Sequence, residues 1–267
     1  MLIDLIIGGL SGVISRTLTA PLELYKIQRQ NAFIPNSTIR DVLKKEGLRY
    51  LWKGNGTNCI RVFPQTAINY GVFEFSKEHV LYGIENKQIN NLLAGSLGGS
   101  VSITLTYPLE TIRSRLTLQT CNSHYNGFLH ACRSIPLRDM FKGLRMSILG
   151  FAPFTALSFS TYFTYREYLE HNTNLNKDLL KVIGGGMAGT TAVSITYPSD
   201  LIRRRLQLQN FDPTVPKYGG IIDCVRKIVK MEGIVGLYRG LPATYIKLFP
   251  TIGIQFLAME RLNECLK

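Results

Sequence analysis

The chain has 267 residues, with 31 Lys and Arg against 18 Asp and Glu, and a formal net charge of +13 at pH 7. Because 45% of its residues are hydrophobic and only 18% are charged, a disordered chain is excluded. The 24 Gly and 11 Pro follow no short period, which excludes a collagen-like sequence. A mean hydropathy of +0.07 together with this positive charge is typical of a membrane protein with charged loops.

A pattern centred on a proline occurs three times along the chain. The prolines are Pro21, Pro108 and Pro198, which are 87 and 90 residues apart. Each is preceded by glycines at thirteen and nine residues, and followed by an acid at two and a base at five residues. The acids are Glu23, Glu110 and Asp200, and the bases are Lys26, Arg113 and Arg203. Chance does not give three copies in one register, so the sequence predicts three repeats. The repeats are placed at residues 1–86, 87–176 and 177–267.

Each repeat predicts two helices of membrane length, because crossing the hydrocarbon takes about 20 mainly apolar residues. The expected first helices are 2–30, 89–118 and 178–208, and the expected second helices are 57–82, 143–170 and 240–264. The Gly-x-x-x-Gly of each first helix lets helix backbones approach closely in a bilayer. This favours spans over the alternative of flexible glycine-rich loops. The sequence therefore predicts an all-α membrane protein with six transmembrane helices in three pseudo-repeats.

The loops between these helices differ in positive charge. The long loops, at about 31–56, 119–142 and 209–239, carry basic clusters, whereas each short connection carries one lysine. The positive-inside rule therefore places the long loops on the inner face and both termini on the opposite face.

Two of the long loops have apolar residues at helical spacing, which predicts a short helix on the membrane surface. These residues are Ile39, Val42 and Leu43 in the first loop, and Ile222, Val225, Ile228 and Val229 in the third. The second loop contains Pro136 and is not expected to hold an equally long helix.

Other classes of protein find little support in the sequence. The five cysteines are scattered without a CxxC pair and the four histidines belong to no ligand-like cysteine spacing, so we expect no disulfide framework, metal site or cofactor. No set of nucleophile and base and no phosphate-binding glycine loop is present, so we expect no enzyme. A basic nucleic-acid-binding protein is the alternative from another class. In such a protein the basic residues would form one patch, whereas in this sequence they are spread among apolar segments.

The three proline segments carry a resemblance to a known family. Pro21-Leu-Glu-Leu-Tyr-Lys26 and its two later copies resemble the P-x-[DE]-x-x-[KR] signature of the mitochondrial carrier family. The resemblance covers the whole chain and includes acid-Gly followed by aromatic-basic-Gly, as in Glu46-Gly47 and Trp52-Lys53-Gly54. The second repeat departs, because Phe141-Lys142-Gly143 has no Glu-Gly before it.

This resemblance implies a bundle of six helices with threefold pseudosymmetry around a central cavity that opens alternately to each side. It further implies a multi-pass protein of the mitochondrial inner membrane, with both termini on the intermembrane-space side. The expected partners are a small anionic substrate and the lipid bilayer, including cardiolipin. We expect a protein that functions as a monomer and binds no nucleic acid.

The charged residues of the signature are expected to form an inner, matrix-side gate. Kinks at the three prolines would draw the first helices together, and charges within a membrane are almost always paired or functional. By resemblance the pairs are Glu23 with Arg113, Glu110 with Arg203, and Asp200 with Lys26. Gln30 and Gln207, nine residues after their prolines, would brace this gate. The alternative is that these charges only snorkel at helix ends.

A second gate is expected at the other face, from the family motif [FY]-[DE]-x-x-[KR] on the second helices. The first repeat matches it with Glu74 and Lys77. The second repeat keeps only the base and the third only the acid, which leaves the pairs Glu74 with Arg166 and Lys77 with Glu260. Because the pair at Phe163 and Asn263 is absent, we expect a weaker outer gate and a preference for the state open toward the termini.

Cations are expected at one depth of the cavity. Arg61, Gly150 and Lys247 each lie three residues before a proline of a second helix, and Arg16 would face the same space. Unpaired cations in a low dielectric favour a polyanion, and phosphate groups are natural ligands of Arg and Lys. The alternative is that these cations are paired with carboxylates.

The substrate-contact positions of the family suggest a nucleotide. Gly150-Phe151 stands where nucleotide-type members have Gly-Ile; Gly150 would leave room for a flat base, and Phe151 or Phe154 could stack on it. Further contact positions on the second helix are Thr66, Asn69 and Tyr70. We expect a carrier that exchanges ADP/ATP, deoxynucleotides, coenzyme A or adenosine bisphosphate. Thiamine pyrophosphate is the near alternative and an amino acid the distant one.

Overall fold

The computed structural model describes residues 2–31, 43–44, 46–83, 86–119, 124–173, 177–211 and 215–266, and within these ranges it contains helices and no strand. The long helices are α1 (Leu2–Leu18), α2 (Ala20–Gln30), α4 (Asn55–Phe75), α5 (Lys87–Leu118), α8 (Leu144–Asn172), α9 (Lys177–Leu208) and α11 (Leu241–Leu266). The short ones are η1 (Leu48–Trp52), η2 (Ser76–Val80), α6 (Phe128–Ser134), α7 (Leu137–Met140), α10 (Ile221–Glu232) and η3 (Ile234–Tyr238). The all-helical prediction is therefore confirmed.

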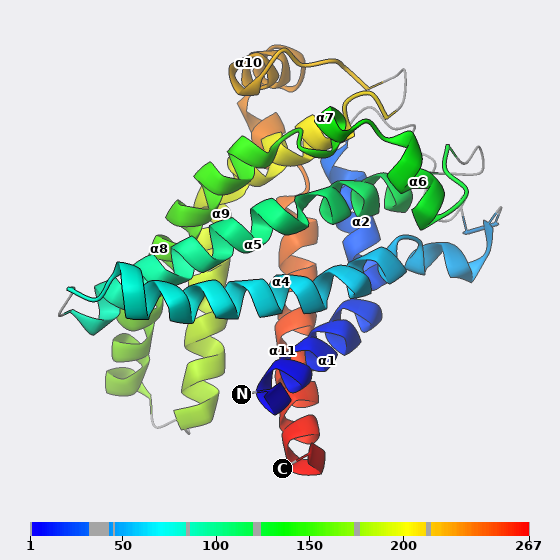
Figure 1. Cartoon of the computed structure of the whole chain (residues 1–267). Helices are drawn as coiled ribbons and strands as arrows, with labels where there is room; N and C mark the ends of the chain where they lie inside the picture. Colours follow the sequence, from blue (N-terminus) through cyan, green and yellow to red (C-terminus); the bar gives the residue numbers. More distant parts are fainter. Residues whose placement is uncertain are drawn as a thin grey trace.

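The long helices pack in a closed order. Helix α1 contacts α4, α4 contacts α5, and the order continues through α8, α9 and α11, which contacts α1 again. Figure 1 shows α4 and α5 lying across the view, whereas α8, α9 and α11 run from top to bottom. The termini lie at one end of the molecule, because the chain starts in α1 and ends in α11, and α10 lies at the other end (Figure 1).

The first predicted helix, over 2–30, is divided in the structure. Helix α1 ends at Leu18, and Thr19 separates it from α2, where Pro21 lies in the first turn. Proline is tolerated in a first turn because the amide that it lacks has no partner within the helix there. At the break, the Ser15 carbonyl accepts from the Thr19 amide at 3.0 Å and from the Thr19 hydroxyl at 2.7 Å. The corresponding helices α5 and α9 continue through Pro108 and Pro198.

The glycine of each basic-Gly pair begins a second helix. Gly143 has φ +88° and Gly240 has φ +90°, a left-handed conformation that side chains with a Cβ rarely adopt. A Cβ on Gly143 would lie 2.9 Å from the Arg203 carbonyl oxygen, and one on Gly240 would lie 3.0 Å from the Gln30 side chain. These glycines therefore let the end of a first helix from the following repeat pack against the turn.

The helices found in the long loops can be compared with those predicted from the sequence. Helix α10 confirms the helix predicted in the third long loop. In its described part, 124–142, the second loop holds the short helices α6 and α7, with Pro136 between them, as its proline predicts. The helix predicted in the first loop falls on residues 39–43, most of which lie outside the described residues.

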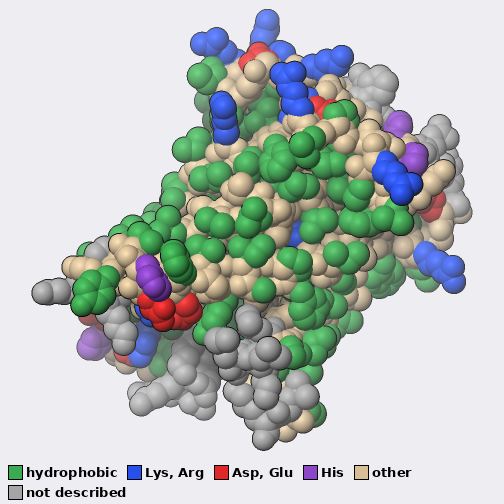
Figure 2. Space-filling view, in the orientation of Figure 1, with side chains coloured by type: hydrophobic (Ala, Val, Ile, Leu, Met, Phe, Trp, Pro, Cys, Tyr) green, Lys and Arg blue, Asp and Glu red, His purple; other side chains and the backbone are tan. Residues whose placement is uncertain are grey.

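Apolar side chains cover the outside of the long helices. Among the described residues, Gln88–Leu118 and Leu137–Asn172 are long and apolar enough to cross a membrane, each with a mean hydropathy of 1.2. On α5, Leu93, Leu97, Val101 and Leu105 recur every fourth residue and are all exposed. Figure 2 shows hydrophobic side chains across the middle of this face and Lys and Arg at the end that carries α10.

Candidate functional site

Two of the three pairs expected at the inner gate lie within ion-pair distance. Arg113 of α5 lies 3.3 Å from Glu23 of α2, and Arg203 of α9 lies 3.2 Å from Glu110 of α5. Both carboxylates are buried. These pairs join the ends of three helices that belong to different repeats.

The third expected pair is a correction, because no ion pair joins Lys26 to Asp200 in the described part of the chain. Asp200 instead lies 3.5 Å from Arg203, and its side chain is 42% exposed. Arg203 is one turn further along the same helix, so Asp200 reaches it without any approach between α2 and α9. Lys26 is buried on α2.

The cations of the second helices are paired, so the expectation that Arg61 and Lys247 have no carboxylate partner is wrong. Arg61 donates to Glu110 at 3.3 Å, and Lys247 contacts Glu23. A buried charge is costly without a partner, and the carboxylates of the inner pairs are within reach. Each of these two carboxylates therefore divides its oxygens between a first-helix arginine and a second-helix cation.

At the equivalent place in the second repeat, Gly150 supplies no cation. A Cβ on Gly150 would lie 2.5 Å from the Ser199 Oγ, so α8 and α9 approach closely here. The space immediately beside Gly150 is thus filled by Ser199, and the glycine serves the packing of α8 on α9.

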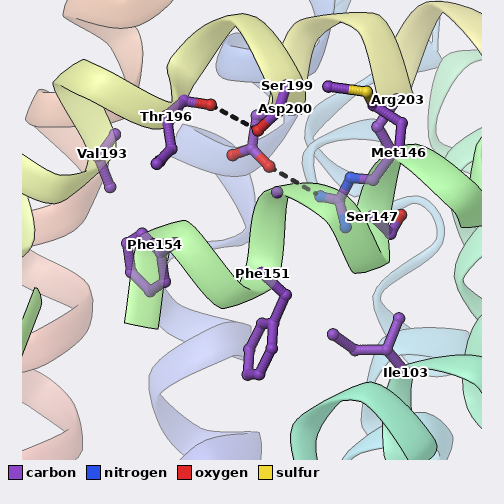
Figure 3. Close-up of a pocket in the computed structure, with 11 residues that line it drawn as sticks. Ile103, Met146, Ser147, Phe151, Phe154, Val193, Thr196, Ser199, Asp200 and Arg203 are labelled. Carbon is purple, nitrogen blue, oxygen red and sulfur yellow. Dashed lines mark hydrogen bonds and ion pairs between the residues drawn. The ribbon is translucent and has the colours of Figure 1, made fainter. Parts of the chain in front are cut away.

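A cavity of about 170 Å³ opens next to this contact. Figure 3 shows Phe151 and Phe154 projecting from α8, and Asp200 and Arg203 projecting from α9. The complete lining is Ile103, Met146, Ser147, Gly150, Phe151, Phe154, Val193, Thr196, Ser199, Asp200 and Arg203. The Phe151 ring also covers Gly99 of α5, where a Cβ would overlap it. The cavity thus combines aromatic walls with one carboxylate and one guanidinium group.

The remaining expected contacts lie outside this cavity. Arg16 donates to Asn58 at 3.5 Å, and the Thr66 hydroxyl donates to the Val62 carbonyl at 2.9 Å. Asn69 packs closely on Gly98 of α5, and Tyr70 is 41% exposed. The structure does not bring Thr66, Asn69 and Tyr70 to the lining of the cavity at Asp200.

In this structure, the pairs expected at the outer gate are not formed between the described residues. Within the described ranges, no ion pair joins Glu74 to Arg166 or Lys77 to Glu260. Arg166 instead pairs with Glu170 at 2.7 Å, and the Lys77 ammonium lies 5.1 Å from the centre of the Phe73 ring. Both cations have a partner within one turn of their own helix, which needs no contact between helices.

Sequence reasoning missed an acid in the second repeat. Lys53 of the first repeat pairs with Glu46 at 3.0 Å, and Arg239 of the third pairs with Glu232 at 3.3 Å. In the second repeat, Lys142 pairs with Asp139 at 2.6 Å. Asp139 therefore replaces the missing glutamate from a different position in the chain, and its spacing of three residues from a lysine was the available signal.

The tyrosine before each of the last two signature prolines was also missed. The Tyr107 hydroxyl donates to the Lys142 carbonyl at 3.1 Å, and the Tyr197 hydroxyl donates to the Arg239 carbonyl at 2.9 Å. Gln30 donates to the Tyr197 hydroxyl at 3.2 Å, whereas Gln207 accepts from Arg204. The two glutamines thus bond to groups that flank the ion pairs. No group of three or more His, Cys, Asp or Glu that could hold a metal ion occurs in the part of the chain that the structure describes.

Taken together, these features define an all-helical bundle built from three copies of one helix pair, with buried ion pairs between the copies. The chain belongs to the mitochondrial carrier family, because residues 1–83, 85–173 and 177–267 each match the family described as "Mitochondrial carrier protein". Proteins of this family are transporters and not enzymes.

Several named relatives match nearly the whole chain. It is 34% identical to the "Mitochondrial adenine nucleotide transporter ADNT1" of Arabidopsis thaliana, over 98% of this chain and 86% of that protein. It is also 34% identical to "Solute carrier family 25 member 16" of Homo sapiens, over 96% of this chain and 86% of that protein. A Dictyostelium discoideum "Mitochondrial substrate carrier family protein A" is 36% identical, over 96% and 83%.

Proposed function

We propose that this protein is a six-span carrier that exchanges nucleotides or nucleotide-like phosphorylated anions across the mitochondrial inner membrane by alternating access. It functions as a monomer in the lipid bilayer, which includes cardiolipin, and it uses no cofactor. The observation that carries the proposal is the sharing of Glu110 and Glu23 between the inner pairs and the cations Arg61 and Lys247.

The exposure of the long helices supports the membrane placement. In the most apolar part of Gln88–Leu118 only 33% of the residues are buried, and in that of Leu137–Asn172 only 11%. A core helix of a soluble protein is mostly buried. A bilayer supplies the apolar environment that these side chains lack within the protein. The basic end with α10 then faces the matrix, and the termini face the intermembrane space.

The shared carboxylates support an anionic substrate. A phosphate group can replace Glu110 on Arg61 and Glu23 on Lys247, because both are oxyanions that accept from the same donors. The Arabidopsis relative is named an adenine nucleotide transporter, which supports a nucleotide as the anion. Thiamine pyrophosphate carries the same phosphate chemistry and is the alternative within this proposal.

The two ends of the bundle support an assignment of state. Ion pairs join three helices at the inner end, and the expected pairs at the outer end are replaced by partners on the same helix. We assign this arrangement to the state that is closed toward the matrix and open toward the termini.

Counter-exchange in proteoliposomes tests the function. Uptake of labelled ATP, dATP, coenzyme A, thiamine pyrophosphate and a basic amino acid is measured with and without internal substrate. We expect one nucleotide to be stimulated by its internal counterpart, and we expect Arg61→Gln and Lys247→Gln to abolish this uptake. The control Arg138→Gln removes an exposed arginine of α7 and should leave it unchanged.

Each outcome decides between the substrates. Uptake of thiamine pyrophosphate alone would replace the nucleotide by the near alternative. Uptake of the amino acid alone, or equal loss in Arg138→Gln, would overturn the role of the two cations in anion binding.

A further inference from the structure

The threefold pattern of shared carboxylates is incomplete at one position. Glu110 forms an ion pair with Arg61, and Glu23 forms one with Lys247. In both pairs the cation lies on the second helix that comes just before the acid's helix in the closed order. For Asp200 the corresponding residue is Gly150, which packs on the neighbouring Ser199 and offers no charge. Among the described residues, Asp200 is therefore the signature acid that receives no cation from a second helix.

The two acids that pair with a second-helix cation are less exposed than Asp200. The side chains of Glu23 and Glu110 are 10% and 7% exposed, whereas that of Asp200 is 42% exposed. Its one ion-pair partner in the described residues, Arg203, is also bound by Glu110 at the shorter distance of 3.2 Å, against 3.5 Å for Asp200. Asp200 thus retains acceptor capacity, since a carboxylate has about four lone-pair sites.

The exposed carboxylate faces an aromatic cavity. Phe151 and Phe154 form part of its wall on α8, and Ile103 and Val193 add apolar surface (Figure 3). A hollow with apolar and aromatic walls and one polar group is suited to a flat ring that carries a hydrogen-bond donor. An ionised acceptor at such a place discriminates against ligands that lack the donor.

We propose that Asp200 is a specificity-determining residue, whose carboxylate accepts a hydrogen bond from the nucleoside end of the substrate while the phosphates bind Arg61 and Lys247. The inference rests on the proposed function and adds a hydrogen-bond acceptor, Asp200, to the base site that the family resemblance implies at Gly150 and Phe151. Two donors of a nucleoside have this chemistry, the amino group of adenine and the ribose hydroxyls.

The test compares three nucleotides in the wild-type carrier and in Asp200→Asn. ATP has both donors, purine riboside triphosphate has a hydrogen in place of the amino group, and 2′,3′-dideoxy-ATP lacks the ribose hydroxyls. The wild type should prefer ATP over one of these analogues by about tenfold or more, the ratio that one hydrogen bond to a charged group supplies. In Asp200→Asn this ratio should fall toward one, because the neutral amide is a weaker acceptor than the carboxylate.

A matched variant separates recognition from gating. Glu23→Gln changes the equivalent acid of another repeat, which is buried, does not line the cavity, and pairs with Arg113 and Lys247 and not with Arg203. It should slow the exchange of all three nucleotides alike and leave their ratios unchanged. Where a variant transports too slowly, the affinity ratios of the same nucleotides are measured from the thermal stabilisation that each gives to the purified protein.

The outcomes keep the two proposals apart. A preference for ATP that persists unchanged in Asp200→Asn, or no preference in the wild type, overturns the role of Asp200 and leaves nucleotide exchange standing. A wild-type carrier that neither exchanges nor binds nucleotides overturns both. Loss of the ATP to purine riboside triphosphate ratio assigns the contact to the amino group, and loss of the ATP to dideoxy-ATP ratio assigns it to the ribose.

Discussion

Removal of the Glu110 carboxylate should destabilise the protein more than removal of either of its cationic partners. Arg61 lies 3.3 Å from Oε2 and Arg203 lies 3.2 Å from Oε1, so one buried carboxylate pairs with two cations from different helices. In Arg61→Gln the carboxylate keeps Arg203. In Glu110→Gln the strong acceptor of Arg61 is lost, and Arg203 keeps only the more distant Asp200.

The magnitude follows from the burial of the groups. Removing one partner of a buried ion pair costs about 3–5 kcal/mol, so we expect Glu110→Gln near the upper end of this range. Arg61→Gln should cost about 2 kcal/mol less, because its remaining partner is not left without a counter-charge. At about 2–4 °C per kcal/mol, the Tm should fall by on the order of 10 °C in Glu110→Gln and by roughly half of that in Arg61→Gln.

The assay is thermal unfolding of the purified protein in detergent, carried out on both single variants and on the double variant. The double variant should be more stable than the sum of the single effects predicts, by about 1–3 kcal/mol, because the two groups interact directly. Glu170→Gln provides the control, since Arg166 and Glu170 form an exposed pair at 2.7 Å and should contribute less than about 1 kcal/mol. Additive single effects, or a Glu170→Gln loss as large as that of Glu110→Gln, would refute the reasoning.

Three further variants test features that are seen in the structure and were not predicted from the sequence. Gly143→Ala should lower the Tm by about 5 °C or more, because φ is +88° and the new Cβ would lie 2.9 Å from a carbonyl oxygen. Asp139→Asn should destabilise by about 1–3 kcal/mol in the same unfolding assay, because its carboxylate lies 2.6 Å from one cation and 3.8 Å from another. In a variant that retains only Cys224 and Cys265, a maleimide at pH 7 should label Cys265 alone, because burial raises the pKa of Cys224 to about 12.

Each of these variants has its own control. Gly185→Ala introduces a Cβ with no neighbour within 4 Å and should leave the Tm unchanged or raise it, so an equal loss there would contradict the account of Gly143. Asp223→Asn removes an exposed acid and should have little effect on the Tm, in contrast to Asp139→Asn. Labelling of Cys224 at the same rate as Cys265 in the folded protein would show that α10 does not bury it, and both should react after denaturation.

The positions of the helices could be predicted because their signals are local. A proline, a glycine pair and a run of apolar residues act within one helix, and α5, α8, α9 and α11 begin and end within three residues of the sequence prediction. The break at Thr19 was not predicted, because the three proline segments look alike although only α2 begins at its proline. Two inner ion pairs followed from the family pattern of acid and base.

The remaining contacts depend on how neighbouring helices are rotated, which no spacing within one repeat reveals. Arg61 meets Glu110 across 49 positions in the chain, and nothing in either repeat alone indicates that contact. The competing contact of Arg166 with Glu170 could have been predicted from the sequence, because an i,i+4 ion pair stabilises a helix by itself. In this structure the contact of Arg166 follows local spacing, and the pairs of the outer gate stay a prediction for the state closed at that end.

In the proposed carrier, the shared carboxylates explain how binding could be coupled to opening at the inner end. A ligand changes a conformational equilibrium only as far as it binds one state better than the other. A phosphate that takes Arg61 and Lys247 leaves Glu110 and Glu23 each with a single arginine, so the closed inner end loses two of the four ion pairs that these carboxylates make. Asp200 loses no ion pair in this exchange, since it holds no second-helix cation, and its open face can therefore select the substrate without itself holding the gate closed.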